Sequence, residues 1–121
     1  GNISTALGIA YAHKATIAIL GDLSFLYDLT GLINTEAINC RFIVINNDGG
    51  GIFSTLPQRG SHGFETVFGT PHGLNPAEIA KSMGISTKQI SSIKDFNSIN
   101  QTNNLNGIYI YISFHKLYIK W

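Results

Sequence analysis

Two uninterrupted apolar runs constrain the fold of this chain more than any other feature. Residues 15–20 read ATIAIL and residues 41–46 read RFIVIN, and each has the length of one strand. Such runs are typical of parallel strands that are buried on both faces. Between them, residues 24–38 carry one apolar stripe at helical spacing, formed by Leu26, Leu29, Leu32, Ile33 and Ala37. A strand, a helix and a strand within about 30 residues form a βαβ unit, whose crossover is right-handed. The sequence therefore predicts an α/β fold, in one domain over residues 1–121, with a mostly parallel sheet and helices on both faces.

The clearest helix boundaries lie in the segment NPAEIAKSMG, residues 75–84. Asn75 is placed to cap the helix, Pro76 takes its first position, and Glu78 lies three residues after the cap. Gly84 is expected to end the helix. This segment predicts a helix with both ends marked.

The remaining elements are less sharply marked. Residues 4–12 predict a short helix, capped by Ser4 or Thr5. Residues 53–73, rich in glycine, predict a long loop, and loops of this length are usually functional. The other expected elements are a strand over 87–93, a helix over 94–102, and an alternating strand over 107–114 at the edge of the sheet.

Composition excludes several classes of function. The net charge is +1 and no basic stripe is present, so nucleic acid and anionic membranes are not expected partners. No apolar run reaches the ~18 residues of a membrane span. Charged residues make up only 12% of the chain, which suits a surface that packs against further protein. Cys40 is the only cysteine, so no internal disulfide can form and a reducing compartment is expected.

The start of the chain and its amino-acid composition suggest a source. The sequence has no initiator methionine and opens within a helical pattern, so we expect an N-terminally truncated domain. It is rich in Ile and Asn, and Lys outnumbers Arg, as in proteins of compact A/T-rich genomes. The expected compartment is the cytoplasm or the plastid stroma.

Polar residues follow both predicted strands. Asp22 comes directly after the first strand and its glycine, and Asn46, Asn47 and Asp48 follow the second. Ligands of open parallel sheets bind beyond the carboxyl ends of the strands, so these side chains are expected to meet. Carboxylate, amide and carbonyl oxygens suit Mg²⁺ or Ca²⁺ and not zinc.

The same corner is suited to phosphate. Ser24 stands at the expected N-cap of the helix over 24–38, whose free N–H groups would favour an anion. Residues 49–51 are all glycine and would let the backbone approach a ligand closely. The pattern thus predicts a metal-bridged phosphate or diphosphate site. The alternative is that each corner is only a turn, because Asn, Asp and Gly are ordinary turn residues.

Three segments resemble a known family. GDLSFLYD, VINNDGGGIFSTLPQ and FETVFGTP closely resemble the C-terminal domain of the SEPHCHC synthases. These are the 2-succinyl-5-enolpyruvyl-6-hydroxy-3-cyclohexene-1-carboxylate synthases, thiamine-diphosphate enzymes of menaquinone and phylloquinone biosynthesis. The similarity covers residues 1–84 and is strongest over 21–71. It implies the thiamine-diphosphate-binding fold, with thiamine diphosphate and Mg²⁺ as cofactors.

The resemblance implies specific roles for the residues of the two corners. Asp22 and Asn47 would bind Mg²⁺ through their side chains, and Gly49 through its carbonyl. Leu23 and Ser24 would hold the diphosphate with backbone and hydroxyl groups.

The resemblance also implies a substrate pocket. Ile52, Phe53 and Leu56 would line the substrate side of the thiazolium, with Ile52 also against the cofactor. The family decarboxylates 2-oxoglutarate on the cofactor, and the resulting carbanion adds to isochorismate.

Part of the family's active site has no counterpart in this sequence. Family members are longer, three-domain chains, and their cofactor-activating glutamate lies in the N-terminal domain and acts across a subunit interface. Glu36, Glu65 and Glu78 lie outside the motif and are not assigned that role. We therefore expect no catalytic residue in this chain, which would need the missing domains or a second chain, in a homo-oligomer. The alternatives are a non-catalytic truncated remnant, or another thiamine-diphosphate-dependent decarboxylase or synthase.

The histidines and Arg59 are weaker candidates. The four histidines, His13, His62, His72 and His115, show no metal-ligand spacing and are interpreted as surface residues. Those at 62 and 72 lie in the long loop, where a substrate carboxylate could reach them. Arg59 is a further candidate for binding a carboxylate.

The remaining polar candidates are interpreted as structural. Asp48 is expected to form a turn, and Asp28 to be solvated or to cap a helix. Ser24 has no histidine near it in sequence, so a nucleophilic triad is not supported. Cys40 is expected in the core.

Overall fold

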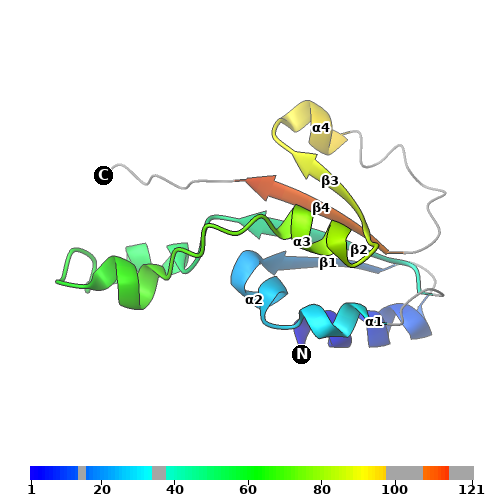
Figure 1. The fold of residues 1–121 in the computed structure, drawn as a ribbon, viewed down its shortest axis with the longest axis horizontal. Helices are drawn as coiled ribbons and strands as arrows, with labels where there is room; N and C mark the ends of the chain where they lie inside the picture. The colour runs from blue at the N-terminus through cyan, green and yellow to red at the C-terminus, as the bar shows by residue number, and fades with distance from the viewer. Residues whose placement is uncertain (14–15, 34–37, 98–107, 115–121) are drawn as a thin grey trace.

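The fold is built on a parallel sheet, seen in a computed structural model that describes residues 1–13, 16–33, 38–97 and 108–114 (Figure 1). The strand order in this part of the chain is β1-β2-β4-β3, and every neighbouring pair is parallel. The strands are β1 (Thr16–Gly21), β2 (Cys40–Asn46), β3 (Ser86–Ile90) and β4 (Ile108–Phe114). The predicted α/β class with a parallel sheet is confirmed.

Short helices connect these strands. The α-helices are α1 (Asn2–Ala12), α2 (Asp22–Leu26), α3 (Pro76–Ser82) and α4 (Ile93–Asn97). Two 3₁₀-helices, η1 (Leu29–Leu32) and η2 (Gly51–Thr55), and a π-helix, η3 (Glu65–Gly69), complete the described elements. Figure 1 shows that the segment with η2 and η3 extends beyond the carboxyl ends of the strands.

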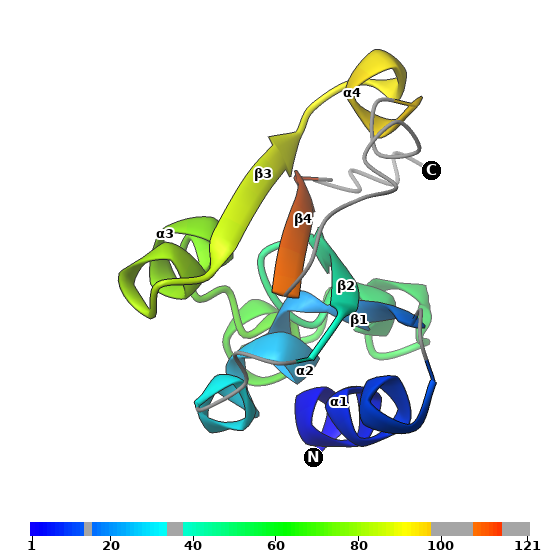
Figure 2. The same ribbon diagram turned by 90° about the vertical axis from the view of Figure 1, so that its right-hand side faces the viewer.

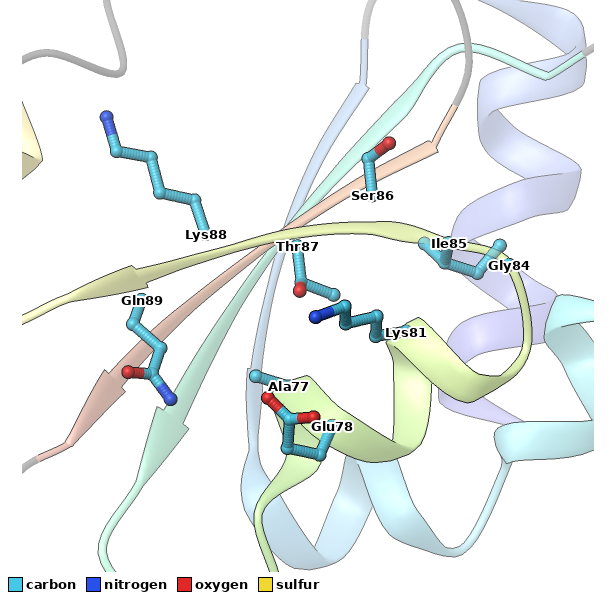
Figure 3. Close-up of a pocket in the computed structure, with 9 residues that line it drawn as sticks. All are labelled: Ala77, Glu78, Lys81, Gly84, Ile85, Ser86, Thr87, Lys88 and Gln89. Carbon is cyan, nitrogen blue, oxygen red and sulfur yellow. The ribbon is translucent and has the colours of Figure 1, made fainter.

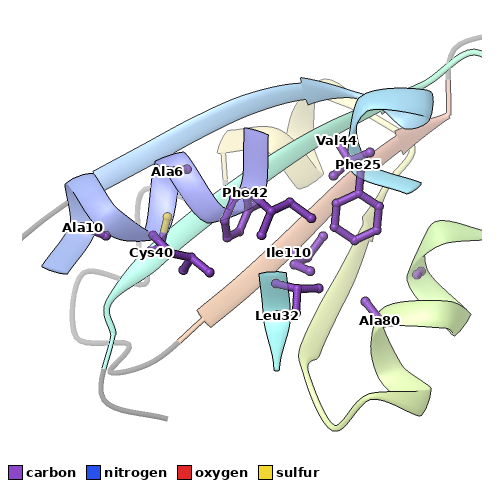
Figure 4. Close-up of a cluster of buried hydrophobic side chains, with 12 residues drawn as sticks. Ala6, Ala10, Phe25, Leu32, Cys40, Phe42, Val44, Ala80 and Ile110 are labelled. Atoms are coloured by element: carbon purple, nitrogen blue, oxygen red, sulfur yellow. The ribbon is translucent and has the colours of Figure 1, made fainter. Parts of the chain in front are cut away.

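The hydrophobic core lies on one face of the sheet. On β2 the side chains of Cys40, Phe42 and Val44 are buried, and in β4 Ile110 is fully buried. Helices α1, α2 and α3 pack on this face and complete the cluster (Figures 2 and 4). Their buried members are Ile3, Ala6, Leu7, Ala10, Phe25, Ala77 and Ala80.

The opposite face of the sheet is less completely covered. On β1 and β2 this face carries Ile17, Ile19 and Ile45, which are 60%, 65% and 42% exposed. Parallel strands normally bury both faces.

The predicted helix over residues 24–38 is interrupted. Helix α2 starts at Asp22, two residues before the predicted cap Ser24, and gives way to η1. The break lies at Asp28, whose carboxylate accepts hydrogen bonds from the backbone and hydroxyl of Ser4 in α1. This tertiary contact takes the chain out of the helical path.

The apolar stripe of that predicted helix is only partly used. Leu32 is buried, and Leu26 and Leu29 pack against the core. Ile33 is exposed, and the fifth member, Ala37, lies outside the described residues. The stripe therefore predicted the core contact at Leu26, Leu29 and Leu32, although the helix expected to carry these residues is broken.

Two further predictions about the elements are wrong. Helix α1 begins at Asn2 without a side-chain cap, so neither Ser4 nor Thr5 caps it. Strand β4 lies between β2 and β3 and not at the edge. The alternation of its sequence signals two unlike faces, which a strand can have in any position.

The helix after the long loop is confirmed. The Asn75 side chain accepts a hydrogen bond from the Ala77 backbone, Pro76 occupies the first helical position, and Gly84 follows the helix with a φ of +80°. Strand β3 and helix α4 fall within the predicted segments or within one residue of them, and residues 98–102 and 107 lie outside the described part.

Candidate functional site

The two polar corners meet as the sequence predicts. The register pairs Gly21 at the end of β1 with Ile45 near the end of β2, so the residues that follow both strands lie side by side. They enclose an open pocket of about 450 Å³. It is lined by Ile19, Leu20, Gly21, Asp22, Leu23, Ser24, Ile45, Asn47, Gly49, Gly50, Ile52 and Phe53.

A larger hollow of about 700 Å³ lies elsewhere, between α3 and β3 (Figure 3). Its lining includes Glu78, Lys81 and Lys88 and none of the residues predicted to bind a ligand. The polar groups that converge from separate elements are at the smaller pocket, which we therefore take as the candidate site.

Asp22 is the centre of the candidate site. Its side chain is only 2% exposed, and its carboxylate accepts hydrogen bonds from three backbone N–H groups. Leu23 donates to Oδ1 at 2.8 Å, whereas Asn47 and Gly49 donate to Oδ2 at 3.1 and 2.9 Å. These bonds compensate the loss of hydration and tie the end of β1 to the loop after β2.

A histidine reaches the same carboxylate. His72 Nε2 lies 3.2 Å from Asp22 Oδ2, and the imidazole is 11% exposed. The interpretation of His72 as a surface residue is therefore wrong. Its place in the long loop was the available signal in the sequence, but the contact spans 50 residues.

The glycine run has a packing role. Gly49 has a φ of +122°, and a Cβ there would collide with the carbonyl oxygens of Gly69 and Thr70. A Cβ on Gly50 would collide with the carbonyl oxygen of Phe68, and the Gly50 N–H donates to Gly69 at 2.7 Å. These two glycines thus admit residues 68–70, while the sequence predicted that they admit a ligand.

Asp48 forms a turn, as predicted, and also fastens the next segment. Its φ is +64°, in the left-handed region that Asp tolerates better than most residues. Its backbone N–H donates to Asn46 Oδ1, and its Oδ1 accepts from the Gly73 N–H at 2.8 Å. Residues 46–51 and 68–74 therefore form one connected unit.

The apolar wall of the pocket comes from η2. Ile52 and Phe53 line the pocket and are 73% and 38% exposed, whereas Leu56, at 39% exposed, lies outside it. The Phe53 ring meets Phe68 edge-to-face at 5.9 Å, and Phe68 stacks on Phe64 at 5.5 Å. Phe68 supports the wall, a role that sequence reasoning missed.

The remaining candidates lie away from the pocket. Among the described residues, His13, Arg59, His62, Glu65 and Glu78 are exposed. Glu36 and His115 lie outside the described residues.

Asp28 and Cys40 are both buried. Asp28 is buried rather than solvated, and the hydrogen bond from the Ser4 backbone is the main cause that lowers its pKa. Cys40 lies in the core, as predicted, and burial raises the pKa of its thiol to about 11.

The donor set fits a hard divalent cation. From the described residues, Asp22 Oδ1 accepts one hydrogen bond and the Asn47 side chain none, so both have oxygen lone pairs left for a cation. The described residues hold no cluster of three His, Cys, Asp or Glu side chains that could bind a metal. A cation at this site would therefore rely on the single carboxylate of Asp22 together with amide and carbonyl oxygens.

The chain belongs to the thiamine pyrophosphate (TPP) enzymes. The model of their C-terminal TPP binding domain matches residues 2–103. This is the family of cofactor-dependent enzymes that the fold and the paired corners indicate.

The similar curated proteins are more specific. The chain is 48% identical over 98 residues to 2-succinyl-5-enolpyruvyl-6-hydroxy-3-cyclohexene-1-carboxylate synthase of Lactococcus lactis, a match that covers 79% of this chain and 18% of that protein. It is 41% identical over 113 residues to the Staphylococcus aureus synthase, covering 90% of this chain and 20% of that protein. The chain thus spans about a fifth of the length of these relatives, and the resemblance to SEPHCHC synthases is confirmed.

A solved structure confirms the fold. The thiamine diphosphate-dependent 4-hydroxybenzoylformate decarboxylase of Rhodococcus jostii RHA1 superposes with a TM-score of 0.69 over 92% of this chain and 22% of its own. At 19% sequence identity, this likeness concerns the fold alone. Within the described residues, no helix has the length and apolar character needed to cross a membrane.

Proposed function

We propose that this chain supplies the diphosphate- and Mg²⁺-binding half of a SEPHCHC synthase active site. The complete enzyme would decarboxylate 2-oxoglutarate and add the product to isochorismate, in menaquinone or phylloquinone biosynthesis. The support is the identity to the Lactococcus lactis synthase together with an intact Asp22 and Asn47 at the pocket.

The observation that carries the proposal is the state of the Asp22 carboxylate. Three donors saturate Oδ2, whereas Oδ1 has one and belongs to a residue that lines the pocket. The carboxylate is therefore held in place through Oδ2, and Oδ1 keeps capacity for a ligand.

Each proposed role falls to a residue of this corner. Asp22 and Asn47 would hold Mg²⁺ with their side chains and Gly49 with its carbonyl, while Leu23 and Ser24 would hold the diphosphate. When bound, the thiazolium of the cofactor supplies the electron sink for decarboxylation.

The apolar side of the pocket has its own proposed role. Ile52, Phe53 and Leu56 would line the substrate side of the thiazolium, with Ile52 also against the cofactor. Phe68, which meets the Phe53 ring, would keep this wall in place.

The other half of the site would come from outside this sequence. The cofactor-activating glutamate and the groups that bind substrate would belong to the N-terminal domains, on the same or a second chain of a homo-oligomer. The composition, rich in Ile and Asn and with more Lys than Arg, suits a compact A/T-rich genome, and the proposed compartment is the cytoplasm or the plastid stroma.

A chimera tests the proposed function. The homologous C-terminal segment of the Lactococcus lactis synthase is replaced by this chain, and consumption of isochorismate with 2-oxoglutarate is measured. We expect turnover that disappears in the Asp22→Ala chimera and persists in an Asp95→Ala control, which changes a partly exposed aspartate of α4 that does not line the pocket. A folded, cofactor-loaded chimera without turnover would contradict the assignment to this synthase.

A further inference from the structure

His72 makes a contact at the candidate site that the sequence did not predict. It comes from the segment after η3, yet its Nε2 reaches Asp22 Oδ2 at 3.2 Å in a largely buried setting. No role in the proposed function was assigned to it. Its contact is with the side chain that would bind the cation, so it needs an explanation of its own.

The direction of the His72 hydrogen bond can be inferred from its other nitrogen. The Leu74 backbone N–H donates to Nδ1 at 2.9 Å, so Nδ1 carries the lone pair. In a neutral imidazole the proton is then on Nε2, which donates to Asp22 Oδ2. The backbone two residues away therefore fixes the tautomer that a carboxylate partner requires.

The position of the ring is fixed by the loop that carries Asn47 and Gly49. Gly73, next to His72, donates to Asp48 Oδ1, and the close approach at Gly49 secures the preceding residues. Asp48 Oδ1 also lies 3.7 Å from His72 Nδ1, too far for a hydrogen bond. Among the described side chains, Asp22 is thus the one that hydrogen-bonds His72.

The hydrogen bond has a consequence for Asp22. With His72, three donors converge on Oδ2 and one on Oδ1, which orients the carboxylate and leaves Oδ1 as the oxygen with capacity for a cation. Without His72, two backbone donors would still hold Oδ2, so the loop would stay closed but the carboxylate would be less constrained.

We propose that His72 is a positioning residue for the cation-binding carboxylate of Asp22. This inference rests on the proposed function, because it concerns the same cation site. Loss of a hydrogen-bond partner behind a metal ligand typically weakens metal affinity about 10- to 100-fold. His72→Ala is therefore expected to raise the Mg²⁺ concentration for half-maximal thiamine diphosphate binding by that factor.

Calorimetry on the full chain tests this. Thiamine diphosphate is titrated at a series of Mg²⁺ concentrations into wild type, His72→Ala, His72→Gln and His62→Ala. Glutamine places an amide N–H where Nε2 stands and should restore most of the affinity, and His62, exposed in the same loop, is the matched control. Thermal unfolding without Mg²⁺ should be similar in all four.

The outcomes separate this inference from the proposed function. Wild-type affinity in His72→Ala, or a loss that only follows a drop in metal-free stability and is not restored in His72→Gln, would overturn the positioning role while the proposed function stands. A folded wild-type chain without Mg²⁺-dependent binding would show that the missing domains are needed to hold the cofactor or that the chain is a remnant. The ¹⁵N shifts of the metal-free His72 ring then decide: an Nε2–H tautomer that is lost in Asp22→Ala supports the contact, and an Nδ1–H ring overturns it.

Discussion

Asp22 and Asp28, six residues apart, make similar hydrogen bonds but have different roles. Both are buried, and both accept hydrogen bonds from backbone N–H groups of a distant segment. Asp28 accepts its bonds from Ser4 and fastens α1, whereas Asp22 lines the pocket. A buried carboxylate is therefore not by itself a sign of function; the difference is that Asp22 lies at a pocket and Asp28 does not.

The largest effect on stability is expected from a substitution in the loop next to Asp22. Gly49→Ala combines an unfavourable φ with a collision against residues 69–70, so we expect a loss of roughly 2–5 kcal/mol in the free energy of unfolding. Gly60→Ala is the matched control, since its φ of +84° is also positive but open space surrounds it. We expect roughly 1–2 kcal/mol there. Denaturant titration measures both, and equal losses would show that residues 68–70 do not press on this loop.

An Asp28 variant should affect stability without affecting the site. Asp28→Asn removes the charge that Ser4 stabilises, so the unfolding temperature is expected to fall by several degrees. Thiamine diphosphate affinity should not change, because Asp28 does not line the pocket. Scanning calorimetry and a binding titration measure the two quantities, and a parallel loss of affinity would remove the distinction between the two aspartates.

The contribution of the Ser4–Asp28 hydrogen bond to stability should depend on pH in the acid range. The pKa of Asp28 is lowered from 3.8, chiefly by the Ser4 backbone hydrogen bond, so its contribution to stability is present above pH 3.8 and is lost as the pH falls through the lower folded value. The stability difference between wild type and Asp28→Asn should therefore narrow below pH 3.8. Denaturation curves at pH 6, 4 and 3 test this, and a constant difference would contradict it.

The sequence predicted the local features of the fold and not the contacts between distant residues. The strands, the α3 cap and the meeting of Asp22 with Asn47 follow from local patterns, because apolar runs, Asn-Pro chemistry and parallel register act over short distances. The end of the helix at Asp28 depends on Ser4, and the burial of His72 depends on a partner 50 residues away. Neither contact leaves a periodic trace in the sequence.

The order of the strands in the sheet could not be predicted from the sequence either. The chain passes from β2 to β3 and leaves one strand position open between them, which β4 then fills. The alternating pattern of the strand contains no information about its neighbours. The glycines at 49 and 50 were similarly ambiguous, because small residues admit a ligand and another backbone segment equally well.

The smallest expected effect lies at the opposite end of β2 from Asn47. Burial raises the pKa of the Cys40 thiol to about 11 from 9.0, so its neutral form contributes stability that is present below pH 9 and is lost as the pH rises through 11. The thiol should also react slowly with alkylating reagents in the folded chain at pH 8. Thiol labelling with and without denaturant measures this, and rapid labelling of the native chain would contradict the burial.

The most direct test of the account is calorimetric titration of thiamine diphosphate, with and without Mg²⁺, into wild type, Asp22→Asn and Asp28→Asn. We expect Mg²⁺-dependent binding in wild type and Asp28→Asn, and about 100-fold weaker binding in Asp22→Asn, since bonds to a charged group are worth up to about 3 kcal/mol. Wild-type affinity in a folded Asp22→Asn chain, or an equal loss in both variants, would contradict the assignment of Asp22 as the cation-binding residue.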